Sequence, residues 1–360
     1  FFADAGAAER PRSGVEFKRQ AASVALGIAR KGDLFPAPRT KNTAASNQIS
    51  ATEAARRQDD IQHRAGQPPD PATDSVIHRR ARMCHISTMS ESMNIFNRLA
   101  HRRHRDRAAE GLKHYDFLLA EVGERLADRL DDVKRSFPLA LDLGCHTGGL
   151  GRLLGGRGGI ETLIQSDLSF AMARLAAAPQ VAADEEALPF AAASLDLVLG
   201  NLSLHWVNDL PGALLQIRRA LKPDGLFLAA MLGGETLKEL RHAFAEAEMA
   251  EEGGISPRLS PLAGVRDLGR LLMRAGFALP VVDADTITVS YADPLKLMRD
   301  LRGMGESNAV AARRKSFSRR GTIMAAAEKY RDTFADGMGR MPATFQVLYL
   351  TAWAPAAGRP

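Results

Sequence analysis

A seven-residue run, Asp142-Leu-Gly-Cys-His-Thr-Gly148, has the composition of a nucleotide-binding loop. An apolar run precedes it and a helical pattern follows it, as in a turn between a strand and a helix. Glycine reaches positive φ without steric cost, and without a Cβ at Gly144 and Gly148 the backbone can approach a ligand closely. The spacing G-x-x-x-G after an acid differs from the G-x-G-x-x-G of dinucleotide sites, so the loop need not hold a pyrophosphate. Cys145 and His146, inside the loop, are predicted to contact the same ligand.

Further acids follow the next two apolar runs. Asp167 ends the second run, where its carboxylate can accept hydrogen bonds from both hydroxyls of a ribose, and Leu168 after it is also predicted to contact the cofactor. Asp184 follows the third run and is a candidate for the amino group of adenine, and Glu185 beside it is a further predicted cofactor contact. Each acid alone is equally well explained as a helix cap or a solvated turn. Their order after successive strands favours an adenosine-binding site.

Acceptor chemistry is expected after the fourth apolar run, in the segment 200–206. Asn201 is predicted to contact the cofactor. His205 is the candidate general base, because an imidazole titrates near neutrality, and an ordinary packed or capping histidine is an equal alternative. Trp206 is favoured as a wall of the cofactor pocket or part of the core over a platform for substrate.

A parallel sheet has to bring these residues together. From residue 137 short apolar runs alternate with helical patterns, which predicts an α/β, Rossmann-like fold. Strands are predicted near 139–143, 162–165, 180–183, 195–199 and 226–231, with helices that begin near 149, 169 and 209. The segment 221–225 is predicted to be a helix exit and tight turn. Ligands in such sheets bind beyond the carboxyl ends of the strands, where the strand order reverses.

The remaining C-terminal part is predicted to close the sheet and to cover the acceptor site. Helices are expected at 235–249 and 265–275, and strands at 281–290 and 345–353 as antiparallel partners. Helices at 294–302 and 316–334 lie between those strands and are expected to form a lid. Arg299, Arg302, Glu306 and Asn308 are candidate partner contacts, and a solvated helix with its cap is the favoured alternative.

Composition narrows the function classes. The chain of 360 residues has a formal charge of +6, but residues 1–88 hold 14 Lys and Arg against 9 Asp and Glu. The remainder has 34 basic and 33 acidic residues, so a general nucleic-acid surface is not predicted. Two cysteines, Cys84 and Cys145, favour a reducing compartment and form no metal-binding pattern, so no metal site is predicted. No apolar stretch is long enough for a membrane-spanning helix.

Two basic segments precede the core. Residues 1–88 are expected to be a disordered leader. An upstream translation artefact, with the true start at Met89 or Met93, is favoured over an organelle transit segment or a functional tail. The segment 98–107 carries five arginines and two histidines, and a solvated helix face is favoured over a contact with an acidic partner or lipid headgroups. A helix at 115–135 is expected to pack over the mouth of the nucleotide site.

Five segments together resemble the class I methyltransferases, and most closely the branch that includes malonyl-ACP O-methyltransferase: LDLGCHTGG, QSDLS, ADEEALPF, LSLHWVNDLPGAL and LKPDGLF. Five others resemble the complex I assembly factor 5 family: MNIFNR, GGETLKELRHAFAEAE, GGISPRLSPLAGVRDLGRLLMRAGF, LMRDLRGMGESNA and PATFQVLYLTAW. This second resemblance covers Met93–Pro355, and its last four segments are far more specific than the nucleotide loop.

The resemblance implies a seven-stranded class I methyltransferase fold with a C-terminal helical insertion. It implies a cofactor-binding core at 137–231 and a substrate lid with closing strands at 232–355. S-adenosyl-L-methionine is the implied cofactor, and the matching positions are Asp142, Gly144, Gly148, Asp167 and Asp184. The family usually has glycine where this chain has His146. A histidine held at positive φ costs on the order of 1 kcal/mol, so weaker cofactor binding is expected.

The family acts in complex I assembly, where it is associated with hydroxylating an arginine of the quinone-proximal iron–sulfur subunit. The resemblance therefore implies a protein substrate in complex I, which is either hydroxylated or methylated. Hydroxylation rests on the resemblance alone, whereas methyl transfer needs few protein groups beyond alignment of the acceptor and one base. The alternatives are an O-methyltransferase for malonyl-acyl carrier protein or a small carboxylic acid, and a non-catalytic assembly chaperone. The implied location is the cytoplasm, with a peripheral contact to the inner membrane, or the mitochondrial matrix in a eukaryote.

Overall fold

A computed structural model describes residues 94–356 and 358 of the chain. The expectations for the leader at 1–88, for Cys84 and for the start sites Met89 and Met93 lie outside the described residues. Within the described part, no helix combines the length and the apolar character that a membrane crossing requires.

Seven strands form one sheet in the order β3-β2-β1-β4-β5-β7-β6. The neighbours β3 to β5 pair in parallel, and β7 is antiparallel to both β5 and β6. The predicted α/β class and seven-stranded sheet are confirmed. The strands are β1 (Leu139–Leu143), β2 (Thr162–Asp167), β3 (Gln180–Ala182), β4 (Leu195–Asn201), β5 (Leu221–Leu232), β6 (Ala278–Tyr291) and β7 (Met341–Trp353).

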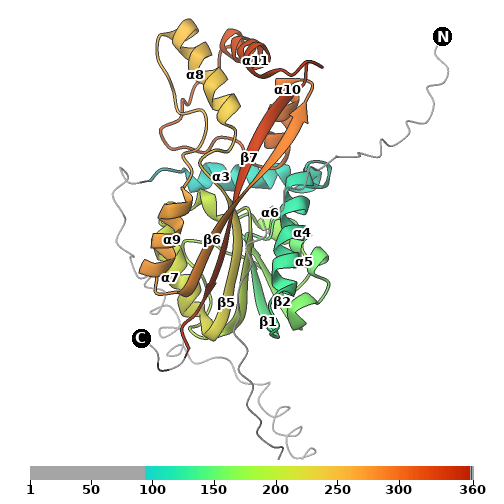
Figure 1. Ribbon diagram of the computed structural model, residues 1–360, viewed down its shortest axis with the longest axis vertical. Coiled ribbons are helices and arrows are strands. Elements are labelled where there is room, and N and C mark those ends of the chain that lie inside the picture. The colour runs from blue at the N-terminus through green and yellow to red at the C-terminus, as the bar shows by residue number, and fades with distance from the viewer. Residues whose placement is uncertain (1–93, 357, 359–360) are drawn as a thin grey trace, which may run out of the picture. The chain divides into compact units, whose positions relative to one another are not determined.

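Helices cover both faces of this sheet. The central strands are therefore buried on both sides, and their residues form continuous apolar runs instead of alternating between apolar and polar. On one face pack α4 (Phe117–Asp131) and α5 (Gly149–Leu154), and on the other α7 (Leu210–Ala220) and α9 (Val265–Arg274) (Figure 1). The strand order reverses between β1 and β4, so the predicted nucleotide loop and the segment after β4 meet at the same edge.

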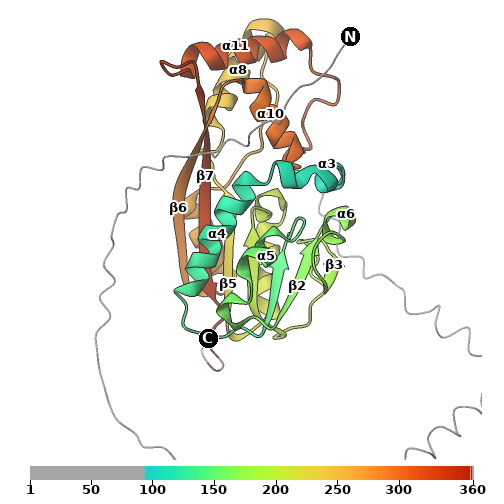
Figure 2. The same cartoon turned by 90° about the vertical axis from the view of Figure 1, so that its right-hand side faces the viewer.

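Three helices form a cap beyond the carboxyl ends of the parallel strands. They are α8 (Lys238–Glu252), α10 (Pro294–Gly303) and α11 (Arg320–Phe334), and the long strands β6 and β7 reach up to them (Figure 1). Helix α3 (Arg98–Ala108) lies between this cap and the sheet, as the turned view shows (Figure 2). The short elements are η2 (Ala109–His114), η3 (Arg157–Gly159), α6 (Phe170–Ala173) and η4 (Leu204–Trp206).

Strands β5, β6 and β7 depart from their predicted bounds, because each is longer than its apolar run. Leu221 already pairs with Leu195, so the predicted turn at 221–225 lies inside β5 as an irregularity, with Asp224 at a φ of 58°. Strand β6 extends to Ala278 because β7 offers it a partner as far as Trp353. Cross-strand pairing, which a local pattern does not show, sets these ends.

Candidate functional site

The predicted nucleotide loop lies between β1 and α5, as expected, and both of its outer glycines have positive φ. Gly144 has a φ of 74° and Gly148 a φ of 75°. A Cβ on Gly144 would lie 2.2 Å from the Cβ of Ser203, and one on Gly148 would lie 2.6 Å from the Oε1 of Gln165. The glycines are thus required by packing against the protein itself, in addition to any ligand.

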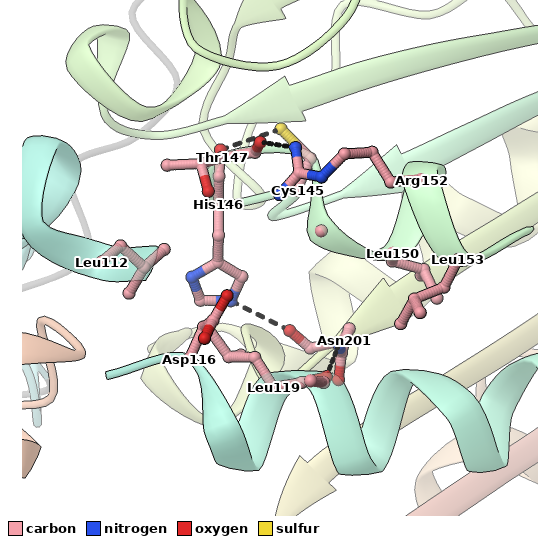
Figure 3. Close-up of a pocket in the computed structure, with 12 residues that line it drawn as sticks. Leu112, Asp116, Leu119, Cys145, His146, Thr147, Leu150, Arg152, Leu153 and Asn201 are labelled. Carbon is pink, nitrogen blue, oxygen red and sulfur yellow. Dashed lines mark hydrogen bonds between the residues drawn. The ribbon is translucent and has the colours of Figure 1, made fainter. Parts of the chain in front are cut away.

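His146 occupies the central position of the loop at a φ of 52°, the left-handed conformation in which the expected strain arises. Its buried imidazole turns toward β4, where Nε2 lies 3.0 Å from the carbonyl oxygen of Asn201 (Figure 3). Burial, with the charge of Arg105 second, lowers the pKa of His146 to about 3. The ring is therefore neutral at physiological pH.

A cavity of about 210 Å³ lies beside this loop, between α4 and the start of α5 (Figure 3). Three predicted cofactor contacts line it, Cys145, His146 and Asn201. Leu119 and Ala120 of α4 form its opposite wall, which agrees with the predicted position of that helix over the site. Sites for drug-sized ligands measure roughly 300–1,000 Å³, so this cavity holds only part of a nucleoside cofactor. Burial raises the pKa of the Cys145 thiol, which keeps the thiol neutral.

Asp142, the penultimate residue of β1, has a fully buried carboxyl group. Neither of its oxygens has a hydrogen-bond partner among residues 94–356. Burial, with the nearby carboxylate of Asp167, raises the pKa of Asp142 to about 7. A buried carboxylate without a donor is costly, so this position favours a ligand that brings a donor or a positive charge.

The pKa of Asp142 makes the stability of the apoprotein depend on pH. Because the folded-state pKa exceeds the ordinary value of about 4, folding favours the protonated acid, and the free energy of unfolding falls as pH rises toward and through 7. We expect Asp142→Asn to raise the free energy of unfolding by about 2–4 kcal/mol at pH 8 and to leave it nearly unchanged at pH 4. Urea unfolding at both pH values measures this, and equal effects at the two would contradict it.

Asp167, the predicted ribose acid, is fully buried and its oxygens are already saturated. Its Oδ1 accepts from the backbone N–H of Ser169 at 2.8 Å and from Nε of Arg105 at 3.1 Å. Its Oδ2 accepts from the backbone N–H of His146 at 2.9 Å and from Nη2 of Arg105. A ribose can reach this carboxylate only if Arg105 leaves it. Leu168, the next predicted contact, is half-buried.

Asp184 and Glu185, the acids predicted at the adenine, also accept hydrogen bonds from an arginine of α3. Arg98 donates through Nη2 to Asp184 at 2.6 Å and to Glu185, and through Nη1 to the carbonyl oxygen of Trp206 at 3.1 Å. Glu185 is buried and Asp184 is half-buried. Two arginines of α3 therefore fill the adenosine half of the site.

The interpretation of 98–107 as a solvated helix face is wrong for one side of α3. Arg98, His101 and Arg105 lie three and four residues apart and so share a face, which is buried against the sheet and Trp206, while Arg102, Arg103 and Arg107 are exposed. This spacing was the signal in the sequence for an inward-facing set. The acids that it meets lie more than 60 residues away along the chain.

His205 lies on η4, buried, with Nε2 at 3.1 Å from Oε2 of Glu306 in the loop after α10. The same carboxylate oxygen accepts from Nε1 of Trp206 at 2.7 Å. Burial tends to raise the pKa of Glu306, but the hydrogen bonds and charge of His205, then Arg105 and Trp206, outweigh it and lower the pKa. An ionised Glu306 can only accept, so the proton shared in this hydrogen bond lies on Nε2 of His205. Nδ1 of His205 is buried and has no hydrogen-bond partner in the described part of the chain.

A second cavity of about 530 Å³ lies under the cap, and His205, Trp206 and Glu306 form part of its wall. A third cavity of only about 10 Å³, which we call the gap, shares lining residues with each of these two cavities. His146 lines the gap and the smaller cavity, whereas His205 and Glu306 line the gap and the larger one. Of the four predicted partner contacts, Arg302, Glu306 and Asn308 line the larger cavity, and Arg299 instead pairs with Asp293 at the surface. Trp206 is buried against Phe96 and His101 in a small core cluster, as one of the two favoured alternatives predicted, and it lines the cap cavity and not the loop cavity.

Sequence similarity relates this chain to known proteins. A family profile described as a methyltransferase domain matches residues 141–229. The chain is 48% identical to the "Arginine-hydroxylase NDUFAF5, mitochondrial" of Danio rerio over 272 residues, which cover 74% of this chain and 84% of that protein. The chain belongs to the arginine-hydroxylase NDUFAF5 family. The Homo sapiens member is 46% identical over 274 residues, covering 74% of this chain and 79% of that protein.

The NDUFAF5 relatives extend well beyond the methyltransferase profile, so the family shares more than the nucleotide-binding core. A second group of relatives is more distant. The "Malonyl-[acyl-carrier protein] O-methyltransferase" of Methylovorus sp. (strain MP688) is 36% identical over 270 residues, covering 71% of this chain and 88% of that protein. The two resemblances found in the sequence are both confirmed.

Among the described residues, no group of three or more His, Cys, Asp and Glu is placed to hold a metal ion.

Proposed function

We propose that this chain is an S-adenosylmethionine-dependent enzyme that modifies a protein substrate, a subunit of respiratory complex I, during complex I assembly. The observation that carries the proposal is the position of His205 and Glu306 in the gap, which shares lining residues with the loop cavity and with the cap cavity. A cofactor held at the loop and an acceptor held under the cap would meet beside this pair. The family name of the relatives supports the modification of arginine, and the methyltransferase profile supports the cofactor.

The residues at the loop fit the cofactor in part as they stand. Gly144–Gly148 and the cavity beside them would receive one end of it. The unpaired carboxyl group of Asp142 suits a donor or an ammonium group, but it is fully buried and does not line the cavity, so it has to be uncovered first. Asp167 and Asp184 suit the ribose and adenine once Arg105 and Arg98 release them. When bound, S-adenosylmethionine supplies a methyl carbon made electrophilic by its sulfonium. We infer that cofactor binding requires the arginine face of α3 to withdraw.

The protein groups at the gap can position an acceptor and take its proton. Glu306 accepts from Nε2 and so orients the ring of His205, which leaves the unpartnered Nδ1 as the atom to receive a proton from an acceptor in the cap cavity. A bound S-adenosylmethionine would supply the methyl group, and Nδ1 of His205 would take the proton that the acceptor loses. The apolar wall around the pair, which includes Leu118, Leu202 and Leu232, excludes water.

Substitution of His205 tests this role. We expect His205→Asn to lower the turnover of the modified substrate by about 10²–10⁴-fold, because a general base contributes this much, and to leave the affinity for S-adenosylhomocysteine within about threefold of wild type. Single-turnover product formation and calorimetry measure the two quantities. His242→Asn, at an exposed position on α8, is the matched control. Undiminished turnover in His205→Asn would contradict a proton-transfer role.

The modification itself is identified by mass. The full-length protein is incubated with S-adenosylmethionine and the purified quinone-proximal iron–sulfur subunit, and intact mass and fragment spectra follow the subunit. A gain of one methyl group or one oxygen on an arginine supports the proposal. A methyl ester on malonyl-acyl carrier protein, with no change in the subunit, would support the function of the more distant relatives instead.

A cellular test separates an enzyme from a chaperone. If Asp167→Asn abolishes cofactor binding yet restores complex I in cells that lack the gene, the enzymatic proposal fails.

In a eukaryote the proposed location is the mitochondrial matrix, as the names of the relatives support, and otherwise the cytoplasm. A peripheral contact with the inner membrane is part of the proposal and is tested by salt extraction of membranes.

A further inference from the structure

The cap cavity has a wall composition that the proposed chemistry does not use. Apolar side chains from α8 and α10 form much of it, among them Leu240, Phe244, Met298 and Leu301. The charged groups on the same wall are five arginines and a single carboxylate. They are Arg241, Arg258, Arg302, Arg313, Arg314 and Glu306.

Two of these arginines are neutralised within the cap. Arg258 lies 2.6 Å from Glu248 and is within 4.0 Å of Glu252, and Arg314 pairs with Glu252. Glu248 has a side chain only 1% exposed, and its oxygens also accept from Ser256. This buried network holds the loop after α8 in place, so these two arginines have a structural role.

The other three have no carboxylate partner in the described part of the chain. Arg241 and Arg313 make only hydrogen bonds to backbone oxygens, at 3.4 Å to Thr236 and 2.9 Å to Val310. Arg302 makes no side-chain hydrogen bond or ion pair with any described residue. The one carboxylate on the wall, Glu306, is already held by His205 and Trp206. The cavity thus carries a net positive charge over an apolar surface.

The arginines and the His205–Glu306 pair lie at different depths in the cap cavity. Arg241 and Arg302 are exposed, so they stand at the mouth, whereas His205 is buried and Glu306 is only 13% exposed at the inner end. A ligand whose reactive atom reaches His205 would pass the arginines with another part of its structure. Guanidinium groups bind carboxylates and phosphates through paired, charge-assisted hydrogen bonds.

We propose that the cap cavity binds an acceptor that carries an oxyanion, a carboxylate or a phosphate, on an apolar body, with Arg241, Arg302 and Arg313 as the anion-binding groups. The acceptor role of this cavity rests on the proposed function, whereas the binding of an anion does not. An acceptor segment without an acidic group would leave three unpaired guanidinium groups along its path.

Four probes of equal chain length test the proposal by calorimetry on the full-length protein at physiological ionic strength: octanoate, octyl phosphate, octanol and octylamine. We expect at least one anionic probe to bind at least about tenfold more tightly than octanol and octylamine. A preference between octanoate and octyl phosphate identifies the headgroup. Equal affinity for the charged and neutral probes would overturn the proposal.

Variants locate the binding. Arg241→Gln/Arg302→Gln changes two exposed side chains. It is expected to lower the affinity for the anionic probe at least about tenfold and to leave the affinity for octanol unchanged. Arg266→Gln/Arg270→Gln, on the exposed face of α9, is the charge-matched control and is expected to bind as wild type does. Equal weakening in both variants would overturn the proposal, since it would show a non-specific effect of net charge.

S-adenosylhomocysteine is titrated into the same preparations, so that the two proposals fail separately. If the nucleoside does not bind but the anion binds through Arg241 and Arg302, the cofactor proposal fails and the oxyanion site stands. If the nucleoside binds and the anion shows no preference, only the oxyanion site is overturned.

Discussion

Replacing Arg105 with glutamine is expected to raise the affinity for S-adenosylhomocysteine at least about tenfold and to destabilise the apoprotein by about 3–5 kcal/mol. The buried guanidinium takes one acceptor position on each oxygen of Asp167, and those positions are the ones that ribose hydroxyls need. Removing one partner of a buried ion pair leaves an uncompensated charge, which accounts for the loss of stability. A bound ribose then supplies the donors that Arg105 supplied.

Calorimetry at a temperature where the variant is folded measures the affinity, and urea unfolding measures the stability. Arg102→Gln is the matched control, because Arg102 lies on the exposed face of the same helix, with a side chain that is 50% exposed. It should change neither quantity by more than a small factor. If Arg105→Gln weakens nucleoside binding, Arg105 is itself a cofactor contact and the competition between α3 and the ribose does not exist.

Asp167→Asn is expected to lower the affinity for S-adenosylhomocysteine by about 10–100-fold. Two charge-assisted hydrogen bonds to the ribose become neutral ones, and the amide nitrogen cannot accept at all. The same change leaves Arg105 buried without a counter-charge, so the apoprotein is also expected to lose about 3–5 kcal/mol.

A double variant separates lost binding from lost folding. Asp167→Asn/Arg105→Gln removes both buried charges, and it is expected to be more stable than either single variant, because replacing a buried pair costs far less than breaking it. Its nucleoside affinity should remain below that of Arg105→Gln. Equal affinity in those two variants would show that the Asp167 carboxylate does not hold the ribose.

The sequence predicted the sheet well where short apolar runs are bounded by chemistry-bearing turns. Strand β1 has the predicted bounds, and β2, β4 and β5 contain theirs, because Gly144, Asp167 and Gly225 mark their ends or turns. The two C-terminal strands, β6 and β7, lie where the sequence predicts them, but the predicted bounds are too short. Strands β6 and β7 continue past their apolar cores since each gives the other a partner along its length.

The interior contacts of the site were not predictable from local pattern. The sequence indicated Asp167, Asp184 and His205, but their partners Arg105, Arg98 and Glu306 lie 62, 86 and 101 residues away along the chain. A basic segment usually lies in solvent, and only the fold shows that one side of this one faces four buried or half-buried acids. The strain expected at His146 was foreseen because it depends on the backbone of the loop alone.

We propose that the nucleotide loop and Asp167 together hold an adenosyl cofactor. Calorimetric titration of the folded wild-type protein with S-adenosylhomocysteine tests it most directly. We predict saturable binding of one nucleoside per chain, weakened in Asp167→Asn and strengthened in Arg105→Gln. No heat of binding in wild type and in Arg105→Gln, from protein shown to be folded by its unfolding transition, would contradict the claim.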